Sequence, residues 1–327
     1  MKNLVEAFPK HMRDALDIAR NSKWDAKAME FSNVVISGLG GSGIGGTIAS
    51  QIIATECTIP IIVNKDYSVP EFINENTLFV ASSYSGNTEE TLEALSKAQE
   101  KGATVACLTS GGKVLQIATE KGYNFLEMPP GFPPRAAFGY SSTLLFHLLA
   151  NFGLVSDSVI NDLAKVPQLI DEQIESIKAQ GKELAEKLNN KLPLIYSAAR
   201  FDGVATRFKQ QINENSKMLC WNAPVPEMNH NELVGWADKH PEAVPVFLRT
   251  KNDYFRTAER MNFSIDLMKS KGANCIELWS KFDSDVLNAY YLISITDWAS
   301  VYIADLRGID PVEVGVITEL KNKLANI

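Results

Sequence analysis

NVVISGLGGSGIGGTIASQI, residues 33–52, carries the pattern of a buried strand, a turn rich in glycine and serine, and a helix. FVASSYSGNTEETLEAL, residues 79–95, has the same layout. The first turn of a helix exposes backbone N–H groups that have no partner within the helix, and such groups bind anions. Two turns of this kind in one domain therefore predict a single anion that is held from two sides.

Around these stretches, apolar runs alternate with helical segments. The strand-like runs are NVVISG, IPIIVN, TLFVASS, ATVACLT and YNFLEM, at residues 33–38, 59–64, 77–83, 103–109 and 123–128. Each run is apolar throughout, not only at every second residue. This pattern is typical of a parallel sheet that helices cover on both faces.

The second half of the sequence repeats the layout after a polar helical stretch. LPLIYSAARFDGVATRFKQQI, residues 192–212, reads as strand, turn and helix, and VPVFLR and ANCIELW follow as further strands. The chain of 327 residues exceeds the roughly 250–300 residues that one core usually serves. We therefore predict an α/β protein with two domains of one type, over residues 1–155 and 191–327, linked by a helix over residues 156–190. The second copy has lost most of its glycines, so only the first is expected to wrap a phosphate.

The composition excludes several classes of function. A net charge of −7 argues against nucleic acid or an anionic membrane surface as the main partner, because both favour clustered Lys and Arg. The four cysteines form no C-x-x-C pair, which indicates neither a zinc site nor a disulfide framework. The sequence has no signal-peptide pattern and no apolar run of about 18 residues, so we expect a cytoplasmic protein.

The first turn contains the spacing of a dinucleotide-binding fingerprint, G-x-G-x-x-G, at Gly38, Gly40 and Gly43. That fingerprint also needs an acid about 20 residues further on, at the end of the second strand. In IIVNKD, the end of this strand falls at Asn64 and Lys65, and the only acid nearby is the next residue, Asp66. A tight turn that merely needs glycine is a second alternative. A serine inside the turn, at position 42, instead favours a compact phosphate monoester.

The second turn, SSYSGNTEE, places three hydroxyl groups within six residues, at Ser83, Ser85 and Thr88. Gly86 permits a close approach of the backbone. A helix cap formed by Ser85 or Asn87 is the alternative, but a cap needs only one of these hydroxyls. Together with Ser42, the three side chains predict a phosphate site at the carboxyl edge of the sheet.

GLGGSGIGG followed by SSYSGNTEETL is similar to the sugar isomerase, or SIS, domain, whose phosphosugar site is marked by S-x-S-G-x-T. With FPPRAAFGYS, NENSK, PEMNHNELVGW and DPVEVGVITELKNKL, nearly the whole chain resembles the bifunctional phosphoglucose/phosphomannose isomerases. The resemblance implies two tandem SIS domains, each a mostly parallel sheet flanked by helices, and a homodimer in which His230 reaches the partner's site. It also implies substrate binding by Gly41, Ser42, Ser83, Ser85 and Thr88, and catalysis by Arg135, Glu214, His230 and Lys321.

The implied reaction moves a proton between C2 and C1 of a hexose 6-phosphate through a cis-enediol. It needs a carboxylate base, positive charge near the enediolate oxygens, and an acid and base for ring opening. Glu214 has amide neighbours that could orient it, Arg135 follows two stiffening prolines, and His230 can both give and take a proton. Each also has an ordinary interpretation, as a surface carboxylate, a loop arginine or a structural histidine, and Lys321 as a solvated lysine. No metal or cofactor is expected.

Three competing functions remain at the level of sequence. A dehydrogenase would use the glycine fingerprint, and a non-catalytic phosphosugar sensor would need a DNA-reading module, for which the N-terminal residues offer no basic cluster. An SIS enzyme that acts on amino-sugar phosphates is a closer alternative. A Ser-His-Asp hydrolase is not supported, because no G-x-S-x-G elbow occurs.

Overall fold

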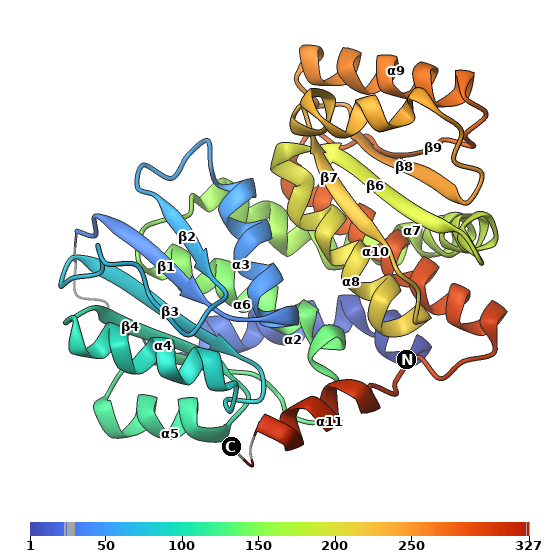
Figure 1. The fold of residues 1–327 in the computed structure, drawn as a ribbon. Coiled ribbons are helices and arrows are strands. Elements are labelled where there is room, and N and C mark those ends of the chain that lie inside the picture. The colour runs from blue at the N-terminus through green and yellow to red at the C-terminus, as the bar shows by residue number, and fades with distance from the viewer. Residues whose placement is uncertain (23, 25–29, 325, 327) are drawn as a thin grey trace.

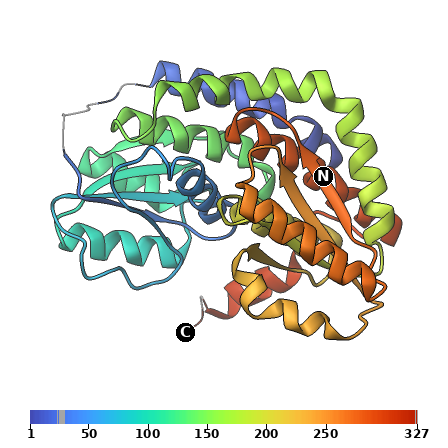
Figure 2. The ribbon, with the colours of Figure 1, turned by 90° about the horizontal axis from the view of Figure 1, so that it is seen from above.

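The computed structural model describes residues 1–22, 24, 30–324 and 326. The N-terminal part contains α1 (Lys2–Glu6), α2 (Phe8–Asn21), β1 (Asn33–Ser37), α3 (Gly40–Ile52), β2 (Ile61–Asn64), β3 (Thr77–Ser83), α4 (Glu89–Glu100), β4 (Thr104–Thr109), α5 (Gly112–Lys121), β5 (Asn124–Glu127), η1 (Pro134–Ala136) and α6 (Phe138–Asn151). The long helix α7 (Asp157–Leu188) follows. Figure 2 shows α7 running along one side of both halves of the molecule.

The C-terminal part contains β6 (Leu192–Ala198), η2 (Ala199–Phe201), α8 (Asp202–Ser216), β7 (Trp221–Val225), η3 (Glu227–His230), η4 (Glu232–Ala237), β8 (Ala243–Thr250), α9 (Phe255–Ser270), β9 (Ile276–Ser280), α10 (Asp285–Arg307) and α11 (Gly315–Leu324). Figure 1 shows the two halves as separate sheets with their own helices, and α11 below both of them. Among the described residues, no helix combines the length and apolar character needed to cross a membrane.

Both sheets are parallel and share one strand order. The first runs β2-β1-β3-β4-β5 and the second β7-β6-β8-β9, so that in each sheet the chain reverses its direction of travel beside the first strand. The carboxyl edge at this reversal is where open α/β sheets bind ligands. We refer to the two positions, between β1 and β3 and between β6 and β8, as the first and second switch points.

The sequence predicted these sheets with one omission. All five strands of the first sheet and β6 of the second lie within the predicted stretches, while β8 extends one residue beyond VPVFLR at each end and β9 one residue beyond ANCIELW at its carboxyl end. β7, with the sequence WNAPV, was missed because it is short and contains a proline. It lies at the edge of its sheet, where a strand can accommodate a residue that lacks an N–H group. The predicted α/β fold class is confirmed.

The residues of β1 alternate between two hydrophobic clusters. Val35 faces a cluster formed with α4 and α5, which cover one face of the first sheet. Val34 and Ile36 face a second cluster that continues through α3 and α6 into β6 and α8. The core is therefore shared by both halves of the chain.

The two halves meet most closely where α3 packs against α8. A side-chain carbon added to Gly203 would lie 2.8 Å from a carbon of Ile48, and the amide nitrogen of Gly203 donates to the Gln51 side chain at 2.8 Å. Nearby, the Arg207 guanidinium lies over the Phe138 ring, 4.0 Å from its centroid. Glycine at position 203 is thus required for the close approach of the two helices.

Candidate active site

The loop after β1 is compact because its glycines allow backbone to touch backbone. A side-chain carbon added to Gly43 would lie 2.2 Å from the Gly38 carbonyl oxygen, and Gly40 has a φ of +53°. Ser42, in the first turn of α3, accepts a hydrogen bond on Oγ from the backbone nitrogen of Tyr84 at 3.2 Å. This bond ties the loop after β1 to the loop after β3 at the first switch point.

The loop after β3 gathers the predicted hydroxyl groups. The hydroxyls of Ser83 and Thr88 are 2.9 Å apart, and the exposed Ser85 accepts a bond from the Asn87 amide nitrogen at 3.2 Å. Gly86 has a φ of +67°, and an added side-chain carbon would lie 1.8 Å from the Gly111 carbonyl oxygen. The structure therefore places Ser42, Ser83, Ser85 and Thr88 together at the carboxyl edge of the first sheet.

The capping alternative for this loop is wrong in its detail. Helix α4 begins at Glu89, so Thr88 is its N-cap, and the Thr88 side chain forms no capping hydrogen bond. Neither Ser85 nor Asn87 occupies the cap position. The first amides of α4 consequently point toward the switch point without a side chain that satisfies them.

Tyr84 connects this loop to the proline-rich segment that carries Arg135. Its hydroxyl donates to the Pro129 carbonyl at 2.9 Å and accepts from the Phe132 nitrogen at 3.0 Å. Gly41 approaches the same segment from the other side, since an added side-chain carbon would lie 3.0 Å from the Pro134 carbonyl oxygen. Arg135 is thus fixed next to both loops of the first switch point.

Arg135 is 4% exposed, and its guanidinium donates in four directions. Nε bonds Asn215 Oδ1 at 2.7 Å, Nη1 bonds Glu214 Oε2 at 3.1 Å, and Nη2 bonds the carbonyls of Pro311 and Val312 at 2.6 and 3.3 Å. Burial lowers the pKa of Arg135, while the neighbouring Glu214 carboxylate opposes that shift. An arginine that remains charged in this position provides permanent positive charge beside a carboxylate.

Glu214 lies in the last turn of α8, and its side chain remains 29% exposed. It lines a pocket of about 450 Å³ together with Asn213, Lys217, Met218, Leu219, Cys220 and residues 313–317. Of the amide neighbours expected to orient it, Asn213 bonds the Met218 carbonyl and Asn215 bonds Arg135. Asn215 therefore acts on Glu214 only through the arginine.

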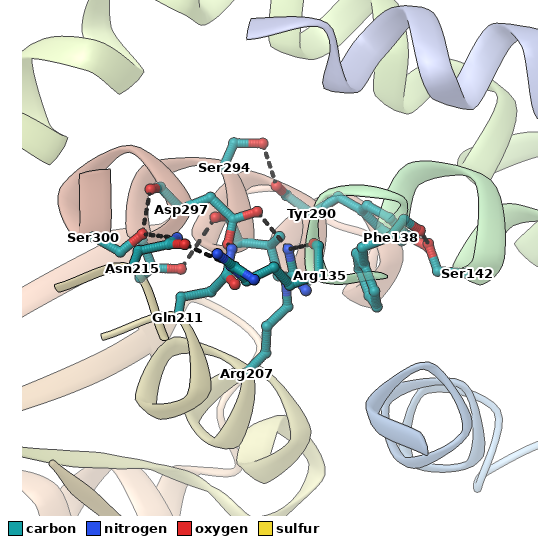
Figure 3. Close-up of polar contacts among 12 residues, drawn as sticks. Arg135, Phe138, Ser142, Arg207, Gln211, Asn215, Tyr290, Ser294, Asp297 and Ser300 are labelled. Atoms are coloured by element: carbon teal, nitrogen blue, oxygen red, sulfur yellow. Dashed lines mark hydrogen bonds and ion pairs between the residues drawn. The ribbon is translucent and has the colours of Figure 1, made fainter. Parts of the chain in front are cut away.

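A buried polar cluster supports Arg135 from the second half of the chain. Arg207 donates to the Arg135 carbonyl at 3.3 Å and to Asp297 at 2.6 Å, and the side chains of both Arg207 and Asp297 are under 10% exposed. Asn215 also donates to Ser300 at 2.9 Å. Figure 3 shows this cluster, in which the labelled residues Arg135, Arg207, Gln211, Asn215, Asp297 and Ser300 lie together beside Phe138.

His230 is not brought to Glu214 within one chain. Helix α8 starts after the carboxyl end of β6 and returns to the amino end of β7, which runs parallel to β6. Glu214 therefore lies near the amino edge of the second sheet, whereas η3, which contains His230, follows the carboxyl end of β7. His230 is exposed, and its side chain has no hydrogen bond to any other described residue.

Lys321 lies on α11, which has no buried residue, and its ammonium forms no bond within the described part of the chain. Sequence reasoning overlooked Lys217, although NENSK was among the quoted motifs. The Lys217 ammonium donates to the carbonyls of Glu214 and Glu313. Only the spacing within NENSK, three residues from glutamate to lysine, could have drawn attention to it.

The nearest acid to the position that a dinucleotide site would require is Asp66, and its carboxylate is hydrogen-bonded within its own turn. Asp66 Oδ1 accepts from the Tyr67 nitrogen and Oδ2 from the Ser68 hydroxyl. Asn64, at the end of β2, donates to the carbonyls of Asp66 and Ser68. No feature of this turn favours the binding of a ribose.

Comparisons with known proteins agree with the fold and with the family that the sequence resembles. The family model of the bacterial phospho-glucose isomerase C-terminal SIS domain matches residues 177–324. A bifunctional phosphoglucose/phosphomannose isomerase of Caldicellulosiruptor bescii is 39% identical, covering 99% of this chain and 98% of its own. That of Aquifex aeolicus is 35% identical, covering 90% and 91%. A D-glucosamine-6-phosphate 4-epimerase of Sulfolobus acidocaldarius is 28% identical over 100% and 99%.

Solved structures show the same fold at lower sequence identity. The C-terminal domain of glucosamine-fructose-6-phosphate aminotransferase from Francisella tularensis matches with a TM-score of 0.74 at 15% identity, covering 94% of this chain and 96% of that one. Glucosamine-6-phosphate deaminase from Thermotoga maritima matches with a TM-score of 0.69 at 14% identity, covering 94% and 96%. These similarities concern the fold alone.

Proposed function

The chain belongs to the family of bifunctional phosphoglucose/phosphomannose isomerases and is an isomerase, and we propose that it interconverts glucose 6-phosphate and mannose 6-phosphate with fructose 6-phosphate. The observation that carries this proposal is the Arg135–Glu214 pair, which lies against the two hydroxyl-bearing loops of the first switch point. A sugar phosphate held by those loops would present its reactive end to the pair.

The phosphate group is bound by neutral donors in this proposal. Ser42, Ser83, Ser85 and Thr88 supply hydroxyl groups, and the first turns of α3 and α4 supply backbone amides. Such a site needs no cluster of lysines, in agreement with the net charge of −7. Gly41 keeps the first loop close enough to Arg135 for one substrate to span both.

Glu214 is the base that removes the C2 proton of the open-chain aldose and returns it to C1. In the same process O2 loses a proton and O1 gains one, so that the cis-enediol becomes the ketose without net change in protons. Arg135 stabilises the negative charge that develops on the enediolate oxygens. The Glu214–Arg135 contact holds the carboxylate at the wall of the pocket, next to the guanidinium.

Both epimers can share this path. Removal of the C2 proton erases the one stereocentre by which glucose 6-phosphate and mannose 6-phosphate differ, so one enediol serves both. A rotation about the C2–C3 bond is needed to bring the C2 hydrogen of the mannose epimer to the same base. The pocket of about 450 Å³ beside Glu214 lies within the size range of small-molecule sites and leaves room for this rotation.

Ring opening is assigned to His230 of a partner subunit, with Lys321 acting at the same end of the substrate. The separation of His230 and Glu214 across the second sheet supports a homodimer, because one chain cannot join the two residues. We also propose that the protein works in the cytoplasm, where its four free cysteines would stay reduced.

The test is an assay of the purified protein with glucose 6-phosphate and mannose 6-phosphate, in which formation of fructose 6-phosphate is measured. Turnover of both supports the proposal. Glucosamine 6-phosphate is included because the Sulfolobus acidocaldarius relative is named an epimerase of that amino sugar. Turnover of this compound alone would favour an amino-sugar enzyme, and binding without turnover of any of the three would favour a phosphosugar sensor.

The dimer assignment is tested by mixing two inactive variants, His230→Ala and Glu214→Gln. Half of the dimers formed by random 1:1 mixing are hybrids, and each hybrid contains one site with both residues intact and one with neither, so activity should return to about a quarter of the wild-type level after subunit exchange. No recovery after exchange has been confirmed would place the histidine in its own subunit's site or outside the reaction.

A further inference from the structure

The segment between α10 and α11 lies against the two cations next to Glu214. We call residues 310–314 the strap. Arg135 donates to the carbonyls of Pro311 and Val312, and the Lys217 ammonium donates to the carbonyl of Glu313 at 2.6 Å. Three successive backbone carbonyls of the strap are thus bound from the site.

Lys217 adopts a backbone conformation that non-glycine residues rarely take. It follows the last residue of α8 with a φ of 52°, in the left-handed region, and only Asn190 shares this feature among non-glycine residues of the described chain. Its ammonium bonds the Glu214 carbonyl as well as Glu313, 96 positions away. Burial lowers the pKa of Lys217, and the charge of Arg135 acts in the same direction.

Helix α11 depends on the strap for its position. It buries none of its side chains, and Val316 on its first turn is 83% exposed. The Glu313 carboxylate accepts a hydrogen bond from the Gly315 nitrogen at the start of α11, while the Glu313 carbonyl is held by Lys217. A continuous set of bonds therefore runs from Glu214 through Lys217 and Glu313 to the helix that carries Lys321.

A lysine that merely caps α8 would need only one of these bonds. A cation at the C-terminus of a helix is favourable because it interacts with the last carbonyls, here that of Glu214. The second bond adds nothing to the cap, but it joins the end of α8 to the strap, and both line the pocket next to Glu214. This second bond distinguishes a positioning role from a capping role.

We propose that Lys217 is a positioning residue of the isomerase reaction: its ammonium clamps the strap to the end of α8, and so sets the place of Glu214 and α11 around the reactive end of the substrate. The inference rests on the proposed function for its effect on turnover. The clamp itself can be measured without any substrate.

The experiment compares Lys217→Met, Lys217→Arg and the control Lys271→Met. Lys271 also follows the last residue of a helix, α9, but its ammonium has no bond within the described residues. For Lys217→Met we expect kcat to fall about 10- to 100-fold with either sugar phosphate, as small misplacements do, while KM changes less than about threefold because the phosphate loops are intact. Lys217→Arg should recover part of kcat, and Lys271→Met should behave as wild type.

Hydrogen exchange of the amides of α11 gives the second readout. In Lys217→Met these amides should exchange at least about tenfold faster than in wild type, and those of α4 should not change. Wild-type kcat in Lys217→Met, or a lowered kcat with unchanged exchange in α11, would overturn the proposal. If the wild-type protein turns over none of the sugars, the proposed function fails, and faster exchange in α11 would still establish the clamp.

Discussion

The two switch points have the same strand order, but the residues in their turns are of different kinds. At the first, the turn after β1 is built from glycines and Ser42, and the hydroxyls after β3 meet one another across a small distance. At the second, the turn after β6 is Ala-Arg-Phe, and Arg200 bonds the Asn252 carbonyl at 2.7 Å and Asp285 at 3.0 Å. The second switch point thus carries the bulky side chain of Arg200 where the first has glycines and small hydroxyl residues.

In the proposed reaction, the second half contributes a residue from the other edge of its sheet. Glu214 stands at the end of α8, near the amino edge of the second sheet, and meets Arg135 from the first half. Topology alone therefore does not tell which edge of a duplicated domain becomes functional. The residue types in the turns decide whether a switch point can take a ligand.

The largest expected effect is a difference in kcat between substitutions in two ion pairs of nearly equal geometry. Arg135–Glu214 and Arg249–Glu277 each join an arginine under 5% exposed to a glutamate about a third exposed, at 3.1 and 2.9 Å. Glu214→Gln should lower kcat by about 10²–10⁴, the usual contribution of a general base, whereas Glu277→Gln should leave kcat unchanged. Steady-state kinetics with both sugar phosphates measures this difference.

Thermal unfolding provides the control, because both substitutions remove one member of a similar pair and should lower Tm to a similar extent. Near-normal kcat in Glu214→Gln would mean that another group removes the C2 proton. The shared enediol for the two epimers would then have to be abandoned.

The next effect compares hydroxyl groups at the two switch points. Ser85→Ala or Thr88→Ala should raise KM about 10- to 100-fold, since a hydrogen bond to a charged group contributes about 1.5–3 kcal/mol. Thr250, at the end of β8, bonds Asp253 at 2.8 Å instead, so Thr250→Ala should lower Tm and leave KM unchanged. Unaltered KM in both Ser85→Ala and Thr88→Ala would leave these hydroxyls with a purely structural role.

A smaller effect, on stability alone, is expected when the charged group of Arg200 is removed from the second switch point. Arg200→Met removes a partly exposed ion pair with Asp285 and should cost about 1 kcal/mol of unfolding free energy or less. Its KM should equal that of wild type, measured with the same sugar phosphates. A rise in KM as large as that of Thr88→Ala would reveal the second switch point as a ligand site.

The smallest effect concerns pH. His11 is buried against the rings of Phe132 and Tyr140, and burial lowers its pKa from the usual 6.5. Below that value the unfolded chain takes up a proton that the folded chain refuses, so stability falls as the pH falls. His11→Gln should therefore lose less Tm than wild type between about pH 7.5 and 5.5, by a few degrees, as about 1 kcal/mol shifts Tm by about 2–4 °C.

Asp253, at the second switch point, should change stability with pH in the opposite direction to His11. Burial raises the pKa of its carboxyl group from the usual 3.8, so the folded chain takes up a proton more readily than the unfolded chain. The contribution of Asp253 to stability therefore increases as the pH falls from the raised pKa of the folded chain toward the usual value. Asp253→Asn should consequently make the decline in Tm on the acid side steeper. A flatter decline in Asp253→Asn, or an unchanged one in His11→Gln, would contradict this assignment.

The sequence predicted the parts of the structure that depend on local pattern. Apolar runs located eight strands, and the spacing of Ser83, Ser85 and Thr88 correctly indicated a loop that gathers hydroxyl groups at the end of one of them. β7 was missed because a short edge strand with a proline carries almost no periodic signal. Local pattern is strong where a buried strand needs an unbroken apolar run.

The rest of the site depends on contacts between distant residues. Arg135 meets Asn215 across 80 positions and the strap carbonyl of Pro311 across 176. Lys217 takes a left-handed conformation that nothing in its side chain predicts. The family resemblance implied that Arg135 and Glu214 belong to one site. Their mutual contact and the bonds to the strap appear only in three dimensions.

Because α3 packs closely on α8, we expect each half of this enzyme to need the other in order to stay in solution. Cutting the chain within α7 would expose Ile48 and the ring of Phe138 on one fragment, and would leave the buried charges of Arg207 and Asp297 at the open face of the other. The fragments would aggregate when produced alone. For the same reason, a half taken from a relative could replace its counterpart only if the residues facing it changed as well, so the two halves must evolve as a matched pair.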